Sequence, residues 1–413
     1  MEVLHERCAG LDVHKDTIVA CVRIACGREV SQEVKTFGTT TKELLALSGW
    51  LEEKRCTHVA MEATGVYWRP VWHILEPDFQ LVLANAAHIR NVPGRKTDVN
   101  DSMWIADLLA HGLIRASFVP PVAIQELRSL TRTRKQLTRE RAQHVLRIQK
   151  TLEDANVKVA SFISDITGKS GRAILTNLIG GATDPQVLLA GTSKRLKATP
   201  DELREALKGH VSKNHRFLLK LHFDQVKAIE DLIERVDEQI GGCLAPFRAK
   251  LKLLVSMPGV GEVVAQVILS EVGADMARFP DAGNLRSWAG FCPRNDETAG
   301  KRRSSRIRPG APWLKTVLVQ AAWSAVRTKN SYLRALFFRL KARRGPGKAI
   351  VAAAASMLTS AYHMLKNDVP YKDLGPTYFE QTDKKRTIRR LTARLHQLGC
   401  EVTIREAPAT VSF

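Results

Sequence analysis

The sequence predicts a mixed α/β N-terminal domain, a long helical middle region and a mostly helical C-terminal part. Short apolar runs of strand length fill the first part, a stretch without Gly or Pro follows Pro120–Pro121, and Gly- and Pro-rich turns separate apolar helices after Leu251. A length of 413 residues suggests two or three domains. We place them at 1–120, 121–250 and 251–366, followed by a basic tail at 367–413 that we expect to fray at its end.

The N-terminal domain is predicted to contain five strands and two helices. Three runs with strand-like patterning follow in meander order, at 8–13, 17–24 and 29–37. Two more short strands are expected at 58–62 and 79–84. The second of these, FQLVLA, is apolar throughout, which is typical of a strand buried on both faces. Helical spacing of apolar residues predicts helices at 40–54 and 99–111.

The middle region is predicted to contain two long helices. Residues 122–160 are rich in Arg, Lys, Gln and Leu and lack Gly and Pro. From Val226 to Ile240 apolar residues alternate at spacings of three and four, a short coiled-coil seam. These helices could pair with each other or with another subunit. The connection at 161–215 contains Gly and Pro, so we expect it to be less regular, and its GKS triplet is no phosphate loop because Ile163 replaces the required glycine.

The charge of the chain points to a polyanionic partner. The net charge is +21 and the pI about 9.9, which favours nucleic acid first and a membrane surface second. No apolar run approaches the roughly 18 residues of a spanning helix, and the N-terminus does not resemble a signal peptide. Seven scattered cysteines without a CxxC pair argue against disulfides and zinc. We therefore expect a cytoplasmic, nucleic-acid-binding protein that binds no membrane.

Four carboxylates lie where predicted elements begin or end. Asp12 ends the first strand, Glu62 ends a later one, and Asp98 and Asp101 share one face at a helix start. Each alone could be a turn residue or an N-cap. Close carboxylates repel unless a cation neutralises them, and Mg²⁺ prefers oxygen ligands and also binds phosphate. Together the four favour a pair of Mg²⁺ ions acting on a phosphodiester.

The C-terminal part carries two candidate nucleic-acid-binding motifs. SMPGVG at 256–261 resembles the turn of a helix-hairpin-helix, in which Gly259 and Gly261 would leave N–H groups free for a DNA phosphate. The alternative is an ordinary packing corner. After this turn comes a basic run, which we expect to contact phosphates, and then an apolar helix predicted at 313–327. The cations of the basic run are Lys301, Arg302, Arg303, Arg306 and Arg308. A second apolar helix is predicted at 348–365.

Hydroxyl groups lie beside the basic run. Thr298, Ser304 and Ser305 are close to it in sequence. A hydroxyl beside several Arg residues could attack a phosphodiester, because the cations would stabilise the charge that develops on phosphorus.

Several separated motifs resemble those of the DEDD transposases of the IS110 insertion-sequence family. They run in order from about Cys8 to about Lys366: GLDVHK, EATGVYW, KTDVND, SMPGVG and AGFCPRNDETAGK. The resemblance implies a RuvC-like N-terminal domain, related in fold to Holliday-junction resolvases and RNase H. Its metal ligands would be Asp12, Glu62, Asp98 and Asp101. It also implies a coiled coil used in homo-oligomerisation as a dimer or tetramer, a C-terminal hydroxyl that links covalently to DNA, and a structured noncoding guide RNA.

One position departs from the family pattern. Where the family usually has Ser before Ala-Gly, this chain has Thr298. Threonine keeps the hydroxyl, but its branched Cβ restricts χ1 and crowds an in-line approach. The nucleophile would be Thr298, Ser304 or Ser305, or this copy is impaired.

These observations predict a DNA transposase that cuts and rejoins DNA. The first alternative is a metal-dependent, Holliday-junction-type nuclease that only hydrolyses DNA. The second is a nucleic-acid-binding protein without catalysis.

Overall fold

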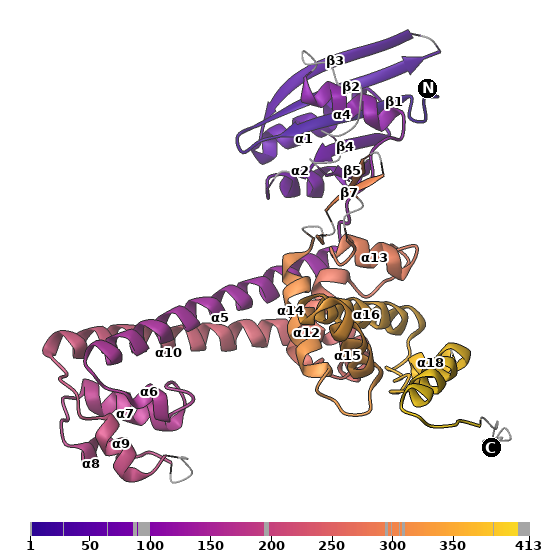
Figure 1. The fold of residues 1–413 in the computed structure, drawn as a ribbon. Helices are drawn as coiled ribbons and strands as arrows, with labels where there is room; N and C mark the ends of the chain where they lie inside the picture. Colours follow the sequence, from indigo (N-terminus) through magenta and orange to yellow (C-terminus); the bar gives the residue numbers. More distant parts are fainter. Residues whose placement is uncertain are drawn as a thin grey trace. The chain divides into compact units, whose positions relative to one another are not determined.

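The chain divides into two compact units, Met1–Val119 and Pro120–Phe413. The structure, a computed structural model, describes residues 2–27, 29–63, 65–85, 89, 100–193, 198–293, 296–298, 300–304, 306–307, 310–382 and 384–403. Figure 1 shows the elements of each unit, and no described helix is long and apolar enough to cross a membrane.

The N-terminal unit contains a mixed five-stranded sheet in the order β3-β2-β1-β4-β5. An antiparallel meander comes first, formed by β1 (Arg7–Val13), β2 (Thr17–Cys26) and β3 (Glu29–Gly38). β4 (His58–Glu62) and β5 (Gln80–Ala84) continue the sheet parallel to β1. All five predicted strands are therefore present.

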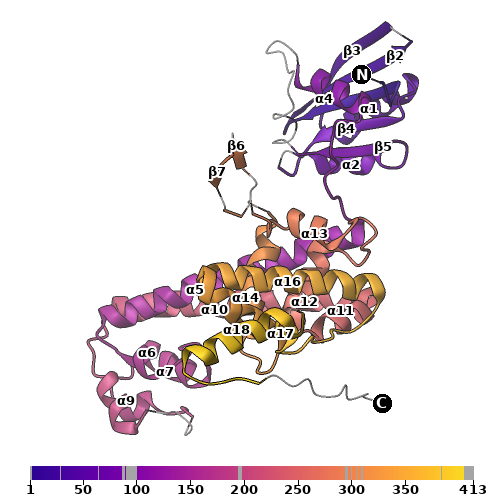
Figure 2. The same ribbon diagram turned by 45° about the vertical axis from the view of Figure 1, so that its right-hand side comes forward.

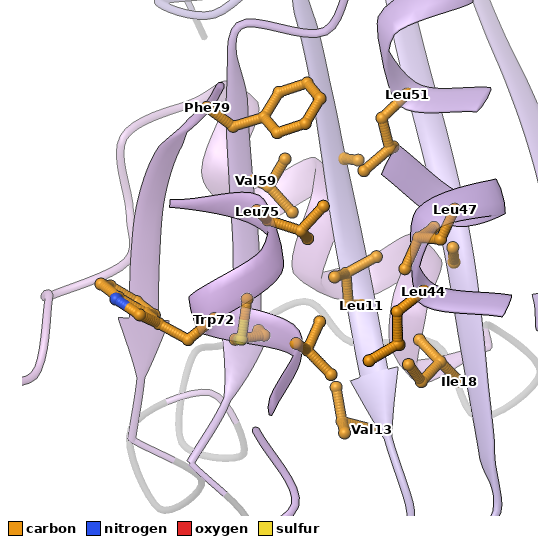
Figure 3. Packing of buried hydrophobic residues seen from close by; sticks show 14 of the residues in the cluster. Leu11, Val13, Ile18, Leu44, Leu47, Leu51, Val59, Trp72, Leu75 and Phe79 are labelled. Atoms are coloured by element: carbon orange, nitrogen blue, oxygen red, sulfur yellow. The ribbon is translucent and has the colours of Figure 1, made fainter. Parts of the chain in front are cut away.

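Helices cover both faces of this sheet. α1 (Thr41–Glu53) and α2 (Trp68–Leu75) lie over one face, and α4 (Asp101–Ala110) lies over the other. Figure 3 shows the core on the first face, where Leu11 packs among the leucines of α1 and Leu75 of α2. The sequence analysis did not predict α2.

β5 packs on both faces, as its apolar sequence predicts, but is fully buried only at its carboxyl end. The strand lies at the edge of the sheet, and only its last two residues, Leu83 and Ala84, are buried. Leu83 joins the core beneath α1 and α2, whereas Ala84 joins the core beneath α4. Leu81 and Val82, which are half-buried, pack against the same two cores, so side chains of the strand contact both cores along most of its length.

The second unit is built on two long helices that lie side by side, α5 (Val122–Asp154) and α10 (Lys213–Cys243) (Figures 1 and 2). Ion pairs link Arg134 to Asp237 and Arg141 to Glu230, so the helices run antiparallel. The seam residue Val226 is buried in a cluster with Ile148 of α5.

The sequence left open whether the two long helices pair with each other or with another subunit, and in the structure α5 pairs with α10 of the same chain. Because α5 covers the seam, the seam alone does not require a second subunit. The predicted oligomer therefore stays a prediction. α5 also ends at Asp154, short of the expected 160, where Asn156 adopts a left-handed backbone with φ 54°.

The connection between the long helices is a small helical subdomain and not the less regular segment expected from its Gly and Pro content. It contains α6 (Val159–Phe162), α7 (Lys169–Ile179), α8 (Pro185–Leu188) and α9 (Pro200–Ala206). Leucines and isoleucines of these helices share one core with the adjacent ends of α5 and α10.

The rest of the chain is mostly helical. It contains η1 (Ala245–Phe247), α11 (Arg248–Val255), α12 (Glu262–Val272), α13 (Ala282–Trp288), the hairpin β6 (Asp296–Thr298) and β7 (Lys301–Ser304), α14 (Pro312–Ala325), α15 (Tyr332–Arg344), α16 (Pro346–Asn367), α17 (Tyr378–Thr382) and α18 (Lys384–Gln397). α14 and α16 correspond to the two predicted apolar helices. α15 was not predicted, and α18 is helical within the tail.

A buried ion pair joins α5 to α12. The Glu271 carboxylate accepts from Arg132 Nε at 2.8 Å and from Arg132 Nη2 at 2.9 Å. Arg128 donates to the carbonyl oxygens of Ser270 and Glu271, at 3.0 and 2.8 Å. Thr131 and Ser270 share a further hydrogen bond of 3.0 Å. The long helix is thereby fixed to the C-terminal helices.

Candidate functional site

Asp12 and Glu62 lie on neighbouring strands at the same edge of the sheet. β1 and β4 are parallel, and Leu11 pairs with Met61, so each carboxylate is the next residue along its strand. Leu11 and Met61 point into the core under α1 and α2. Because side chains alternate along a strand, Asp12 and Glu62 face the opposite side, which α4 covers. The sheet therefore brings these two carboxylates together.

Gly10 sets how α4 lies on this face. A Cβ at Gly10 would lie 2.3 Å from Ser102 O and 2.4 Å from Ala106 N. The Cys8 thiol, two residues earlier on β1, donates to Ala106 O at 3.6 Å. α4 therefore contacts β1 backbone to backbone and runs antiparallel to it, with its first residue, Asp101, toward the Asp12 end.

A helix cap and an ion pair hold α4 in this position. The Asn100 side chain caps the helix by accepting from Ser102 N at 3.2 Å. Near the other end of α4, Asp107 pairs with the buried Arg23 of β2 across 3.3 Å. These contacts fix the start of α4, and with it Asp101, relative to the sheet.

The set of four carboxylates is not complete in the structure. Asp98 lies outside the described residues. Across the described part of the chain, no three His, Cys, Asp or Glu side chains are grouped closely enough to hold a metal ion. Carboxylate oxygens nevertheless suit Mg²⁺, and two of them stand on adjacent strands at one edge. The donor chemistry fits the ion, while the convergence of all four stays a prediction.

His14 is a neighbour of this site that sequence reasoning missed. Its Nε2 lies 3.1 Å from Asp12 Oδ2, and its side chain is exposed. The signal was present in GLDVHK, because residues two apart lie on the same side of an extended chain. A histidine in this position can hold the Asp12 carboxylate or give up that contact to a cation.

Three thiols in this unit are buried, and burial disfavours their charged form. Burial raises the pKa of Cys8 to about 12 and the pKa values of Cys21 and Cys56 to about 11. They therefore stay protonated at neutral pH, in agreement with their interpretation as small apolar residues.

Thr298 lies at the tip of a hairpin. Thr298 pairs with Lys301, which leaves a two-residue connection in which Gly300 has φ 73°. Pro293 and Ile307 pair at the base. Of the predicted cations, Lys301 and Arg306 are exposed. The side chains of Thr298, Arg302 and Arg303 lie outside the described part, as do Ser305 and Arg308 as a whole.

Ser304, one of the two alternative hydroxyls, already makes a hydrogen bond. Its Oγ accepts from the backbone N of Arg306 at 3.2 Å. It also lies at the end of β7, away from the tip of the hairpin. Thr298 and Ser304 thus lie at different positions along the hairpin.

The two glycines of the 256–261 turn have different surroundings. Gly259 has φ 79°, and a Cβ there would lie 2.4 Å from Ala321 O of α14. Gly259 is therefore required by packing against α14. Gly261 is exposed, caps the start of α12 and has no atom within 4 Å of its Cβ position. The turn is thus open beside Gly261 and closed by α14 at Gly259, and its binding of a DNA phosphate stays a prediction.

Comparison with known proteins agrees with this arrangement. A family profile for transposases of the DEDD IS110 type matches residues 9–157, and one described as "Transposase IS116/IS110/IS902 family" matches residues 251–337. Together they cover more than half of the chain. A Sinorhizobium fredii protein named "Putative transposase y4rJ" is 24% identical over 262 residues, which are 59% of this chain and 58% of that protein. The match thus spans less than two thirds of the relative's length.

An α/β unit with carboxylates at one sheet edge, followed by helices that carry a basic hairpin, places the chain among the DEDD transposases. More narrowly, the chain belongs to the IS110 family of transposases.

Proposed function

We propose that this chain cuts and rejoins the DNA of its own insertion sequence, using Mg²⁺-binding carboxylates and a hydroxyl nucleophile. The observation that carries the proposal is the register of β1 and β4, which sets Asp12 beside Glu62 on the face that α4 covers. Asp101, at the start of α4, and Asp98, just before it, would complete the RuvC-like metal site. Mg²⁺, when bound, would stabilise the attacking and leaving oxygens of the phosphodiester.

The strand-transfer step needs no external energy source. Thr298 Oγ attacks phosphorus, and its proton leaves as the new O–P bond forms. The bond from phosphorus to the leaving DNA oxygen breaks, and that oxygen takes up a proton. A DNA hydroxyl then reverses the step on the phosphothreonine and releases Thr298. Lys301, Arg302 and Arg303 would offset charge on the five-coordinate phosphorus.

We propose further that DNA and a guide RNA bind through charge. The net charge of +21, the exposed Lys301 and Arg306, and the exposed start of α12 at Gly261 support phosphate binding. The RNA would derive from the ends of the element. RNA that copurifies with the protein from cells carrying the element should map to the DNA flanking the gene.

Metal-dependent cleavage tests the carboxylates. Supercoiled plasmid carrying the flanking DNA is incubated with the full chain, with its copurifying RNA and with Mg²⁺ or EDTA. Asp12→Asn and Glu62→Gln should abolish cleavage and leave DNA binding intact. Asp16→Asn is the matched control, because Asp16 is an exposed carboxylate four residues away. Full activity of Asp12→Asn would contradict the proposal.

A covalent protein–DNA adduct tests the hydroxyl. Labelled DNA that stays with the protein on a denaturing gel reports the adduct. Thr298→Ala should abolish it, and Thr298→Ser should preserve or raise it by removing the crowding methyl. Loss of the adduct in Ser304→Ala or Ser305→Ala, with Thr298→Ala unaffected, would move the role to that serine. Cleavage without any adduct would favour the hydrolytic nuclease.

A further inference from the structure

A long stretch of the C-terminal part carries no carboxylate. Residues 298–367 contain fifteen Lys and Arg residues and no Asp or Glu. This stretch forms β7, α14, α15 and α16 of the second unit (Figure 1). Its cations therefore have no acidic partner within the stretch itself.

Two large aromatic side chains are exposed within this stretch. Trp323 of α14 is 42% exposed and Phe338 of α15 is 47% exposed. Both contact the buried Phe337, with ring centroids 5.6 Å apart for Trp323 and 5.4 Å apart for Phe338. The buried ring thus anchors two exposed rings on neighbouring helices, and each keeps nearly half of its surface in contact with solvent.

Cations surround these rings. Arg334 lies 4.9 Å and Lys341 lies 5.7 Å from the centroid of Phe338. Arg327 is exposed in the turn that follows α14, four residues after Trp323, and Arg334 Nη1 donates to Val326 O at 3.4 Å. Within the described residues, no ion pair joins these three cations to a carboxylate. We call Trp323, Arg327, Arg334, Phe338 and Lys341 the aromatic patch.

We propose that the aromatic patch binds unpaired nucleotides, with bases stacked on the rings and phosphates on the cations. The charge selects a polyanion, and the rings select among polyanions, because a base can stack on them only when it is not held in a duplex. An apolar protein partner could pack against the rings, but it would offer no negative charge to the cations. The inference rests on the proposed function, which supplies a nucleic-acid partner. It adds that the nucleotides bound at the aromatic patch are unpaired.

Binding of two oligonucleotides tests the proposal. The probes are a 20-nucleotide oligo-dT and a 20-base-pair duplex, each fluorescently labelled, with the full chain and binding followed by anisotropy. Stacking is worth about 1–3 kcal/mol per base, so Trp323→Leu and Phe338→Leu should each weaken oligo-dT binding about 5- to 150-fold. Duplex binding should change less than about 2-fold, since its affinity rests on phosphate contacts. Phe217→Leu, which changes an exposed aromatic on α10, is the matched control and should change neither.

Two further measurements separate stacking from a loss of structure. Trp323→Phe keeps a ring and should restore most of the oligo-dT affinity. A 2-aminopurine in the oligonucleotide should lose fluorescence on binding to the parent and keep it with Trp323→Leu. An equal loss of oligo-dT and duplex binding in the leucine variants, or unchanged oligo-dT binding, would overturn the proposal. A parent that binds duplex but not oligo-dT also overturns it and leaves the proposed function intact, whereas a parent that binds neither contradicts both.

Discussion

The buried pair of Arg132 and Glu271 gives a prediction whose size follows from the structure. The Glu271 side chain is 1% exposed, and Arg132, which is 33% exposed, donates to both of its oxygens. Arg132→Leu would leave a buried carboxylate with Arg128 Nε as its nearest described cation, 3.8 Å away. Breaking such a pair costs about 3–5 kcal/mol, and we expect the lower end because water can enter beside the exposed part of Arg132.

The ranking of the variants by loss of stability tests the reasoning as well as the size of each loss. Glu271→Leu should cost less than Arg132→Leu, because Arg132 can turn its charge toward water. The double variant should recover much of the loss, since two apolar residues leave no buried charge. Arg204→Leu is the matched control, because Arg204 and Asp201 are 44% and 89% exposed and such pairs contribute about 0–1 kcal/mol.

Urea unfolding of the full chain, followed by circular dichroism, measures these differences. The chain has two compact units, so only the transition of the second unit should move. The reasoning is refuted if Arg132→Leu costs no more than Arg204→Leu. It is also refuted if the double variant is less stable than Arg132→Leu alone.

Three more predictions follow from other contacts. Gly10→Ala places a Cβ 2.3 Å from Ser102 O, so in a thermal melt it should destabilise the first unit by about 1–3 kcal/mol. It should also impair Mg²⁺-dependent cleavage. Gly241→Ala is the control and should be neutral or stabilising, because no atom lies near its Cβ position. Burial, and after it the adjacent His144, lower the pKa of His222, so the protein should lose stability as pH falls below about 6.5. His222→Gln should reduce this loss, measured by urea unfolding at pH 7 and pH 5. Duplex affinity should fall steeply between 50 and 200 mM salt, about 10³-fold or more if six or more phosphates are contacted, and a flat salt profile would exclude phosphate contacts as its source.

The sequence by itself determined the N-terminal sheet and the position of two carboxylates in it. Strand-length apolar runs fix local structure, because alternation along five to ten residues suffices to define a strand and its faces. Asp12 and Glu62 follow such runs directly, so their place at strand ends could be predicted without knowledge of the fold. The order of the family motifs likewise lies in the sequence alone.

Only the tertiary structure decided what these elements contact. The Val226–Ile240 seam could have faced another subunit, and it is α5 of the same chain that covers it. Gly259 and Gly261 look equivalent in PGVG, yet α14 packs on the first and leaves the second open. Likewise, Trp323 and Phe338 look like ordinary apolar residues of two helices until folding buries Phe337 between them. A local pattern states which face of an element is apolar, but the partner of that face comes from distant residues whose shape and charge complement it.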